Sequence, residues 1–149
     1  MRWGFAWFAA TFLAHTLCSY GQSPTGLKES QIAALTTGNI SGLAPAASDA
    51  PAVQLTKKWT SIATELLGSS HVQVPRESAG VLSEFIYRGA NRFVTEGAPR
   101  ERESEAEQNL RRFVMTAIQA LKEKPTYLGL DTATVSKAES SICPLWPFC

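Results

Sequence analysis

The sequence predicts an all-α fold, a small bundle of three main helices with a short helix near each end. Apolar residues recur at steps of three and four through residues 51–121, which is the spacing of one helix face. Proline and glycine separate these runs at the points where helices begin and end. The one partly alternating stretch, residues 69–74, is short and has no partner strand. The chain has 149 residues, enough for one domain with its own core.

The first 21 residues have the features of a secretory signal peptide, in the right order. Arg2 supplies a positive start, residues 3–14 are uncharged and mostly apolar, and Ser19 and Gly21 place small residues before a cleavage site. An uncleaved membrane anchor and lipidation at Cys18 are the alternatives. We therefore expect a secreted or periplasmic protein with no membrane span after cleavage.

The cysteine count agrees with the removal of this segment. Cleavage discards Cys18 and leaves Cys143 and Cys149, an even pair that an oxidising compartment drives to form a disulfide. That bond would close a small C-terminal loop carrying Trp146 and Phe148. These aromatic residues either plug the helical bundle or form a hydrophobic tip that contacts a partner, since tryptophan is enriched at binding hot spots.

Residues 22–50 are expected to be a flexible or loosely packed N-terminal segment with a linker. Residues 27–37 have a loose apolar side and predict a short helix that Gly38 terminates, but so short a helix is marginal unless it docks on a larger unit. Residues 38–50 are rich in Gly, Ala, Ser and Pro and show no apolar period. Asn39 begins an N-glycosylation triplet that matters only in a eukaryotic secretory pathway.

Residues 51–149 form the predicted helical domain, and its first helix covers residues 51–67. A proline suits the first turn of this helix, and Ser48 or Asp49 can cap it. Gly68 is a natural position for its end.

Two long helices are predicted over residues 75–96 and 99–124, followed by a short one that ends near Ser141. Gly89 lies on the apolar face of the first long helix, where glycine costs about 1 kcal/mol relative to alanine, so we expect a close helix crossing there. Gly97 leaves so short a connection that the two long helices should be antiparallel. The second has the most regular apolar face in the chain: Leu110, Phe113, Val114, Ala117, Ile118 and Leu121.

Composition excludes one class of partner. The chain has 14 basic and 13 acidic residues, and they are intermixed after the N-terminus. It therefore lacks the basic stripe that binds phosphate backbones, and no nucleic-acid partner is expected.

The sequence offers few residues for catalysis. His71 is the only histidine outside the predicted signal peptide and lies in a short polar connection. Glu101 and Glu105, like Glu103 and Glu107, are four residues apart and share a helix face, where carboxylates bind cations or act as acid and base. Carboxylate metal sites on helices usually add a histidine, which this helix lacks, and neighbouring arginines favour a solvated, charged helix start. We expect no metal and no cofactor.

These observations predict an exported, non-catalytic interaction or structural protein, with a protein partner or a second copy of the chain. One alternative is a small hydrolase that uses His71 and a carboxylate of the 99–124 helix. Another is a carrier of an apolar ligand, held in a pocket between amphipathic helices. The pocket of such a carrier would be lined by Trp59, Phe85, Phe93 and Phe113.

Overall fold

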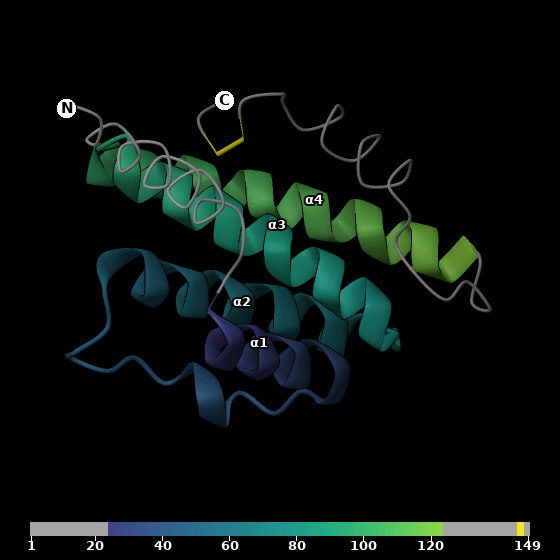
Figure 1. Cartoon of the computed structure of the whole chain (residues 1–149). Coiled ribbons are helices and arrows are strands. Elements are labelled where there is room, and N and C mark those ends of the chain that lie inside the picture. Colours follow the sequence, from purple (N-terminus) through teal and green to yellow (C-terminus); the bar gives the residue numbers. More distant parts are fainter. Residues whose placement is uncertain (1–23, 124–145, 148–149) are drawn as a thin grey trace, which may run out of the picture.

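The computed structural model describes residues 24–123 and 146–147, and every regular element in these ranges is helical (Figure 1). The α-helices are α1 (Thr25–Thr37), α2 (Pro51–Ser69), α3 (Arg76–Thr95) and α4 (Glu103–Glu123), and the 3₁₀ turns are η1 (Ser41–Leu43) and η2 (Arg100–Arg102). The predicted all-α bundle is therefore confirmed. The short helix predicted to end near Ser141 lies outside the described residues.

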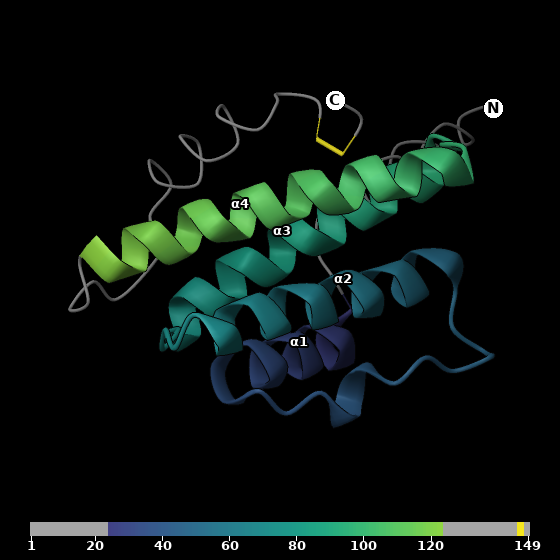
Figure 2. The same ribbon diagram turned by 180° about the vertical axis from the view of Figure 1, so that it is seen from behind.

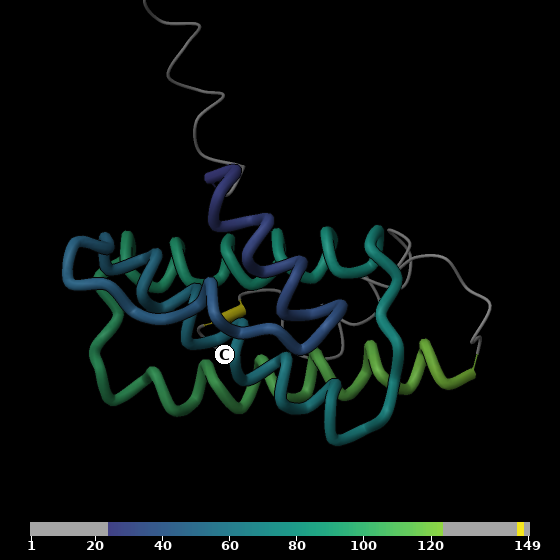
Figure 3. Tube along the Cα trace, turned by 90° about the horizontal axis from the view of Figure 1, so that it is seen from below, coloured from purple at the N-terminus to yellow at the C-terminus, as the bar shows by residue number. Residues whose placement is uncertain are grey.

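The helices form a bundle in which α1 and α2 lie on one side and α3 and α4 on the other (Figures 1 and 2). Helices α2, α3 and α4 run in alternating directions, as Figure 3 shows from below. The closest backbone approaches join α2 to α3 and α4, and α1 to α2 and α3. Although α3 and α4 are consecutive and antiparallel, as predicted, their backbones approach each other at few points. Figure 1 shows the Trp146–Pro147 segment on the side of α3 and α4 that faces away from α1.

The apolar face predicted on α4 forms the centre of the core. All six of its predicted residues are buried, and so are the residues of α2 and α3 that pack against them. On α2 the buried face is narrow, because Leu55, Ile62 and Leu66 are only partly buried at its edge. The hydrophobic spacing thus identified the correct faces, and packing decided how deep each residue lies.

Helix α2 ends later than the sequence predicted, at Ser69 and not near residue 67. Gly68 is the penultimate helical residue, and His71 takes the left-handed backbone conformation, with φ of 54°. Its N–H donates to the carbonyl of Gly68 at 3.2 Å. The chain thus turns at His71, which is not a glycine, and the left-handed backbone conformation carries a steric cost for a residue with a Cβ.

The N-terminus of α2 is not capped by a side chain, contrary to the prediction for Ser48 or Asp49. The carboxylate of Asp49 instead accepts hydrogen bonds from Lys57 Nζ at 2.7 Å and from the backbone N–H of Ala46 at 2.9 Å. Lys57 also donates to the carbonyl of Ala44 at 3.1 Å. These contacts hold the glycine- and proline-containing connection against α2.

Helix α1 packs more closely than the sequence suggested for this segment. The amide of Gln31 is fully buried and donates to Thr60 Oγ1 on α2 at 3.0 Å and to the carbonyl of Ser83 on α3 at 3.2 Å. Leu35 lies in the same core cluster as the three long helices. Gly38 ends the helix with φ of 78°, as predicted. A buried glutamine weakens the apolar pattern of α1, so the sequence gives little sign of how firmly it docks.

The long predicted helix over residues 99–124 divides into two elements. Pro99 precedes the 3₁₀ turn η2, and the α-helix proper begins at Glu103. Helix α3 covers nearly the whole of its predicted range, and Gly97, with φ of 64°, follows it in the turn to η2. The connection is therefore short, as predicted.

Candidate functional site

The most distinctive feature of the bundle is the position of Trp146. Its side chain is only 7% exposed, and Pro147 is almost completely buried. The indole lies near Trp59 of α2, with ring centroids 5.1 Å apart, and is stacked on Phe85 of α3 at 5.2 Å and 10° between planes. A residue near the C-terminus thus completes the core between helices that come much earlier in the chain.

Gly89 of α3 makes room for this indole. A Cβ atom added at Gly89 would overlap Cε2, Cζ2 and Nε1 of Trp146. The sequence predicted a close helix crossing at this glycine. The atoms nearest to the added Cβ belong to the Trp146 side chain.

Other aromatic rings support the site from behind. Phe85 stacks on Phe113 of α4 with centroids 3.7 Å apart, and Phe93 meets Trp59 edge to face at 5.9 Å. We call the residues that contact the indole of Trp146, namely Trp59, Phe85 and Gly89, the aromatic socket. Aromatic pairs with centroids about 4.5–7 Å apart, such as Trp59–Phe93, contribute about 0.5–1.5 kcal/mol each beyond the burial of area.

Both indoles in the socket bury an N–H group without an acceptor. Nε1 of Trp59 and Nε1 of Trp146 are each buried, and no acceptor lies within reach in the part of the chain that the structure describes. A buried donor without a partner costs about 1–3 kcal/mol. Among the described residues, the docked indole is therefore stabilised by buried area and ring stacking, and its N–H group has no acceptor.

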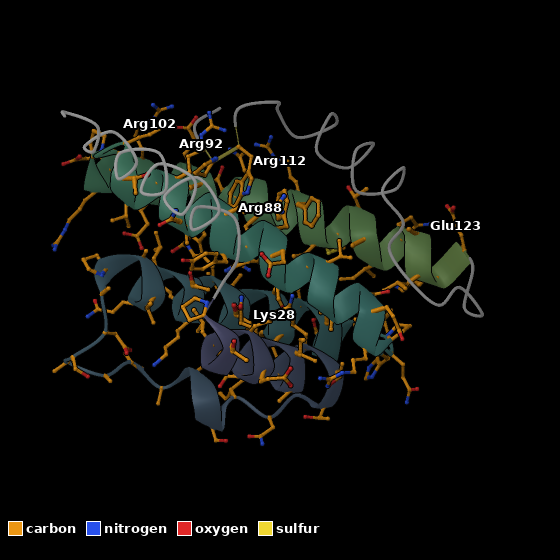
Figure 4. All side chains as sticks on the ribbon, viewed as in Figure 1. Lys28, Arg88, Arg92, Arg102, Arg112 and Glu123 are labelled. Atoms are coloured by element: carbon orange, nitrogen blue, oxygen red, sulfur yellow. The ribbon has the colours of Figure 1, made fainter. Side chains whose placement is uncertain are left out.

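One polar contact fixes the backbone of the docked segment. Arg92, one turn beyond Gly89 on α3, donates from Nη1 to the carbonyl of Trp146 at 3.3 Å, and its Nε pairs with Glu96 at 3.0 Å. Figure 4 shows that Arg92, Arg102 and Arg112 lie on the side of α3 and α4 that faces away from α1. The rim of the socket thus carries charged side chains, with Arg92 paired to Glu96 and Arg102 to Glu105, while its floor is apolar.

The sequence-predicted hydrolytic residues do not come together. His71 is exposed in the turn after α2. Glu103 and Glu107 of α4 contact Lys58, which lies in the first half of α2. Ser69 lies eleven positions after Lys58 on α2, a rise of about 16 Å at 1.5 Å per residue. The pairing of His71 with a carboxylate of α4 is therefore wrong for this conformation.

The paired carboxylates of α4 are balanced by a residue that sequence reasoning missed. Lys58 Nζ lies 2.6 Å from Glu103 and 3.0 Å from Glu107, and hydrogen bonds to these two carboxylates raise the pKa of the Lys58 ammonium group above its ordinary value. Arg102 pairs with Glu105 at 3.4 Å. These contacts match the expected charge-laced helix start, although the strongest partner comes from α2 and not from the neighbouring arginines.

The four aromatic residues predicted to line the pocket of a carrier are all buried, and they contact one another or Trp146. Trp59 and Phe93 form one pair and Phe85 and Phe113 the other, with Trp146 against both Trp59 and Phe85. In this conformation the space that a ligand would need is occupied by the chain itself.

Three further sequence predictions fall on the C-terminal residues. Cys143, Cys149 and Phe148 lie outside the described residues. Among the residues that are described, no three His, Cys, Asp or Glu side chains are grouped so as to hold a metal ion. None of the helices in these ranges combines the length and the apolar composition needed to cross a bilayer.

Comparison with known proteins gives no further information on the site. The sequence matches no protein-family model, and no curated protein and no solved structure is significantly similar to it.

Proposed function

We propose that this protein is an exported, non-catalytic interaction protein whose aromatic socket binds a Trp-Pro segment of a polypeptide. The proposal rests on the position of Trp146. This single tryptophan, 7% exposed, enters a site formed by α2 and α3 and backed by α4. Recognition of a buried aromatic anchor by an apolar pocket with a charged rim is typical of peptide-binding surfaces.

The chemistry of the socket indicates what it accepts. Trp59 and Phe85 offer two ring faces, and the missing Cβ of Gly89 leaves room for the edge of the indole. Arg92 donates to a main-chain carbonyl, which every peptide carries. The preferred ligand is therefore an uncharged segment with an indole followed by proline.

A peptide in trans tests this function. The full-length Trp146→Ala variant leaves the socket without its own indole, and the probe is a fluorescent, end-blocked peptide with the sequence of residues 144–148, Pro-Leu-Trp-Pro-Phe. We expect binding by fluorescence anisotropy. Binding to the wild-type chain should be at least about tenfold weaker, because the tethered tail competes at high effective concentration.

Two results would contradict the proposal. Absence of binding to the folded Trp146→Ala variant at probe concentrations up to about 1 mM, the effective concentration of a tethered tail, would mean that the socket is not a recognition site. Equal binding of a control peptide with alanine in place of tryptophan would mean that the indole is not the anchor.

Export is the second part of the proposal and has its own test. The order of charge, apolar run and small residues in the first 21 positions supports cleavage after Gly21. N-terminal sequencing of the exported protein should begin at Gln22, and a chain that begins at Met1 or at a lipidated Cys18 would contradict it. Mass spectrometry without reduction should give a mass two hydrogens lower than after reduction, because Cys143 and Cys149 pair.

A further inference from the structure

We infer that the polypeptide recognised by the socket is a second copy of this chain, which inserts its own Trp146–Pro147 segment in place of the resident one. This inference rests on the proposed function and names its partner. A second copy is the occupant whose fit the structure already displays, because the same indole, stacking contacts and Arg92 hydrogen bond are made within one chain.

The length of the connecting chain permits this exchange. Helix α4 ends at Glu123, and residues 124–145 connect it to Trp146. Within one molecule the tail must return only to the level of Phe113, ten residues back along α4, which is about 15 Å. The connecting residues can span about 75 Å when extended. The covalent connection therefore does not force the tail into its own socket.

Few polar contacts hold Trp146 against the other described residues. Its only hydrogen bond to the described residues is the one from Arg92, at 3.3 Å, and the indole N–H has no acceptor among them. Exchange replaces each contact with the identical contact in the neighbouring molecule. The ratio of exchanged dimer to monomer therefore depends on the protein concentration relative to the effective concentration of the tail. A short tether holds its end at about millimolar effective concentration. Wild-type chains should therefore dimerise extensively only near that protein concentration.

Two full-length variants remove the competition within the chain. Gly89→Leu blocks the socket and frees an intact tail, while Trp146→Ala keeps an open socket and has no indole to insert. Alone, neither variant can form the exchange contact. Mixed at about 100 µM each, they should form a one-to-one heterodimer. If the docked tail outnumbers the undocked tail about 30-fold or more at an effective concentration of about 1 mM, its Kd for a socket in another chain is about 30 µM or tighter.

A matched control comes from the same helix. Gly80 of α3 has no heavy atom within 4 Å of an added Cβ, so Gly80→Leu should keep its tail docked. Its mixture with Trp146→Ala should contain about sevenfold less heterodimer, or less still, in sedimentation velocity. If Gly89→Leu does not fold by circular dichroism, Gly89→Ala serves in its place, because the Cβ alone overlaps the indole.

The outcomes separate the two proposals. A heterodimer from the Gly89 variant but not from the Gly80 variant supports tail exchange. Absence of heterodimer with both chains folded overturns it, and if the peptide of residues 144–148 still binds the Trp146→Ala variant, the recognition function stands with a different partner. A heterodimer that persists when the Gly89 variant also carries Trp146→Ala overturns the exchange mechanism, because the association then does not use the tail.

Discussion

The contact between Gly89 and Trp146 predicts that replacing two glycines of α3 by alanine changes the free energy of unfolding in opposite directions. Gly89→Ala adds a methyl group where the Trp146 indole lies, whereas Gly80→Ala adds it where there is open space. Both substitutions replace glycine by alanine inside α3, so both gain helix propensity of about 1 kcal/mol. The difference between them isolates the effect of the indole.

The size of the loss at Gly89 follows from what the methyl group displaces. Three atoms of the rigid indole would overlap it, and the indole is held on its other sides by Trp59 and Phe85. Expulsion of the side chain resembles truncation of a buried tryptophan, which costs about 3–5 kcal/mol. After the gain in propensity, Gly89→Ala should lower the free energy of unfolding by about 2–4 kcal/mol.

Urea denaturation followed by circular dichroism measures both variants. Gly80→Ala should unfold at a higher urea concentration than wild type, and Gly89→Ala at a clearly lower one. In the Trp146→Ala background the penalty should vanish, and Gly89→Ala should then stabilise by about 1 kcal/mol, as at Gly80. A Gly89→Ala variant as stable as Gly80→Ala would refute the assignment of Trp146 to the core.

Three other substitutions test separate parts of the structure. Phe113→Ala should cost about 3–5 kcal/mol in denaturant unfolding, because this ring is buried and stacked on Phe85; a loss below about 1 kcal/mol would contradict the position of α4. His71→Gly should stabilise by about 0.5–1 kcal/mol, since glycine adopts φ of 54° without strain, and His71→Ala should leave peptide binding unchanged. The hydrogen bond from Lys57 and the one from a backbone N–H lower the pKa of Asp49. Wild type should therefore be more stable than Asp49→Asn above about pH 4, and this difference should disappear as the pH falls through the lowered pKa; a difference that is constant with pH would contradict the ion pair.

The sequence by itself determined the helices and their buried faces. The recurrence of apolar residues at three and four steps placed Leu110 to Leu121 in the core, because a helix with 3.6 residues per turn brings them to one side. Local backbone chemistry also ended α1 at Gly38, since glycine adopts positive φ at little cost. Such features depend on near neighbours in the chain, so a sequence displays them directly.

Only the tertiary structure decided what lies against those faces. Gly89 marked a close approach, but the sequence could not say that the approaching group was Trp146, 57 residues later and beyond a long connection. Lys58 as partner of Glu103 and Glu107, and the buried amide of Gln31, were hidden for the same reason. Long-range contacts depend on how whole helices pack, and packing is a property of many residues at once. The aromatic socket therefore exists only in the folded chain, where α2 and α3 meet the C-terminal tryptophan.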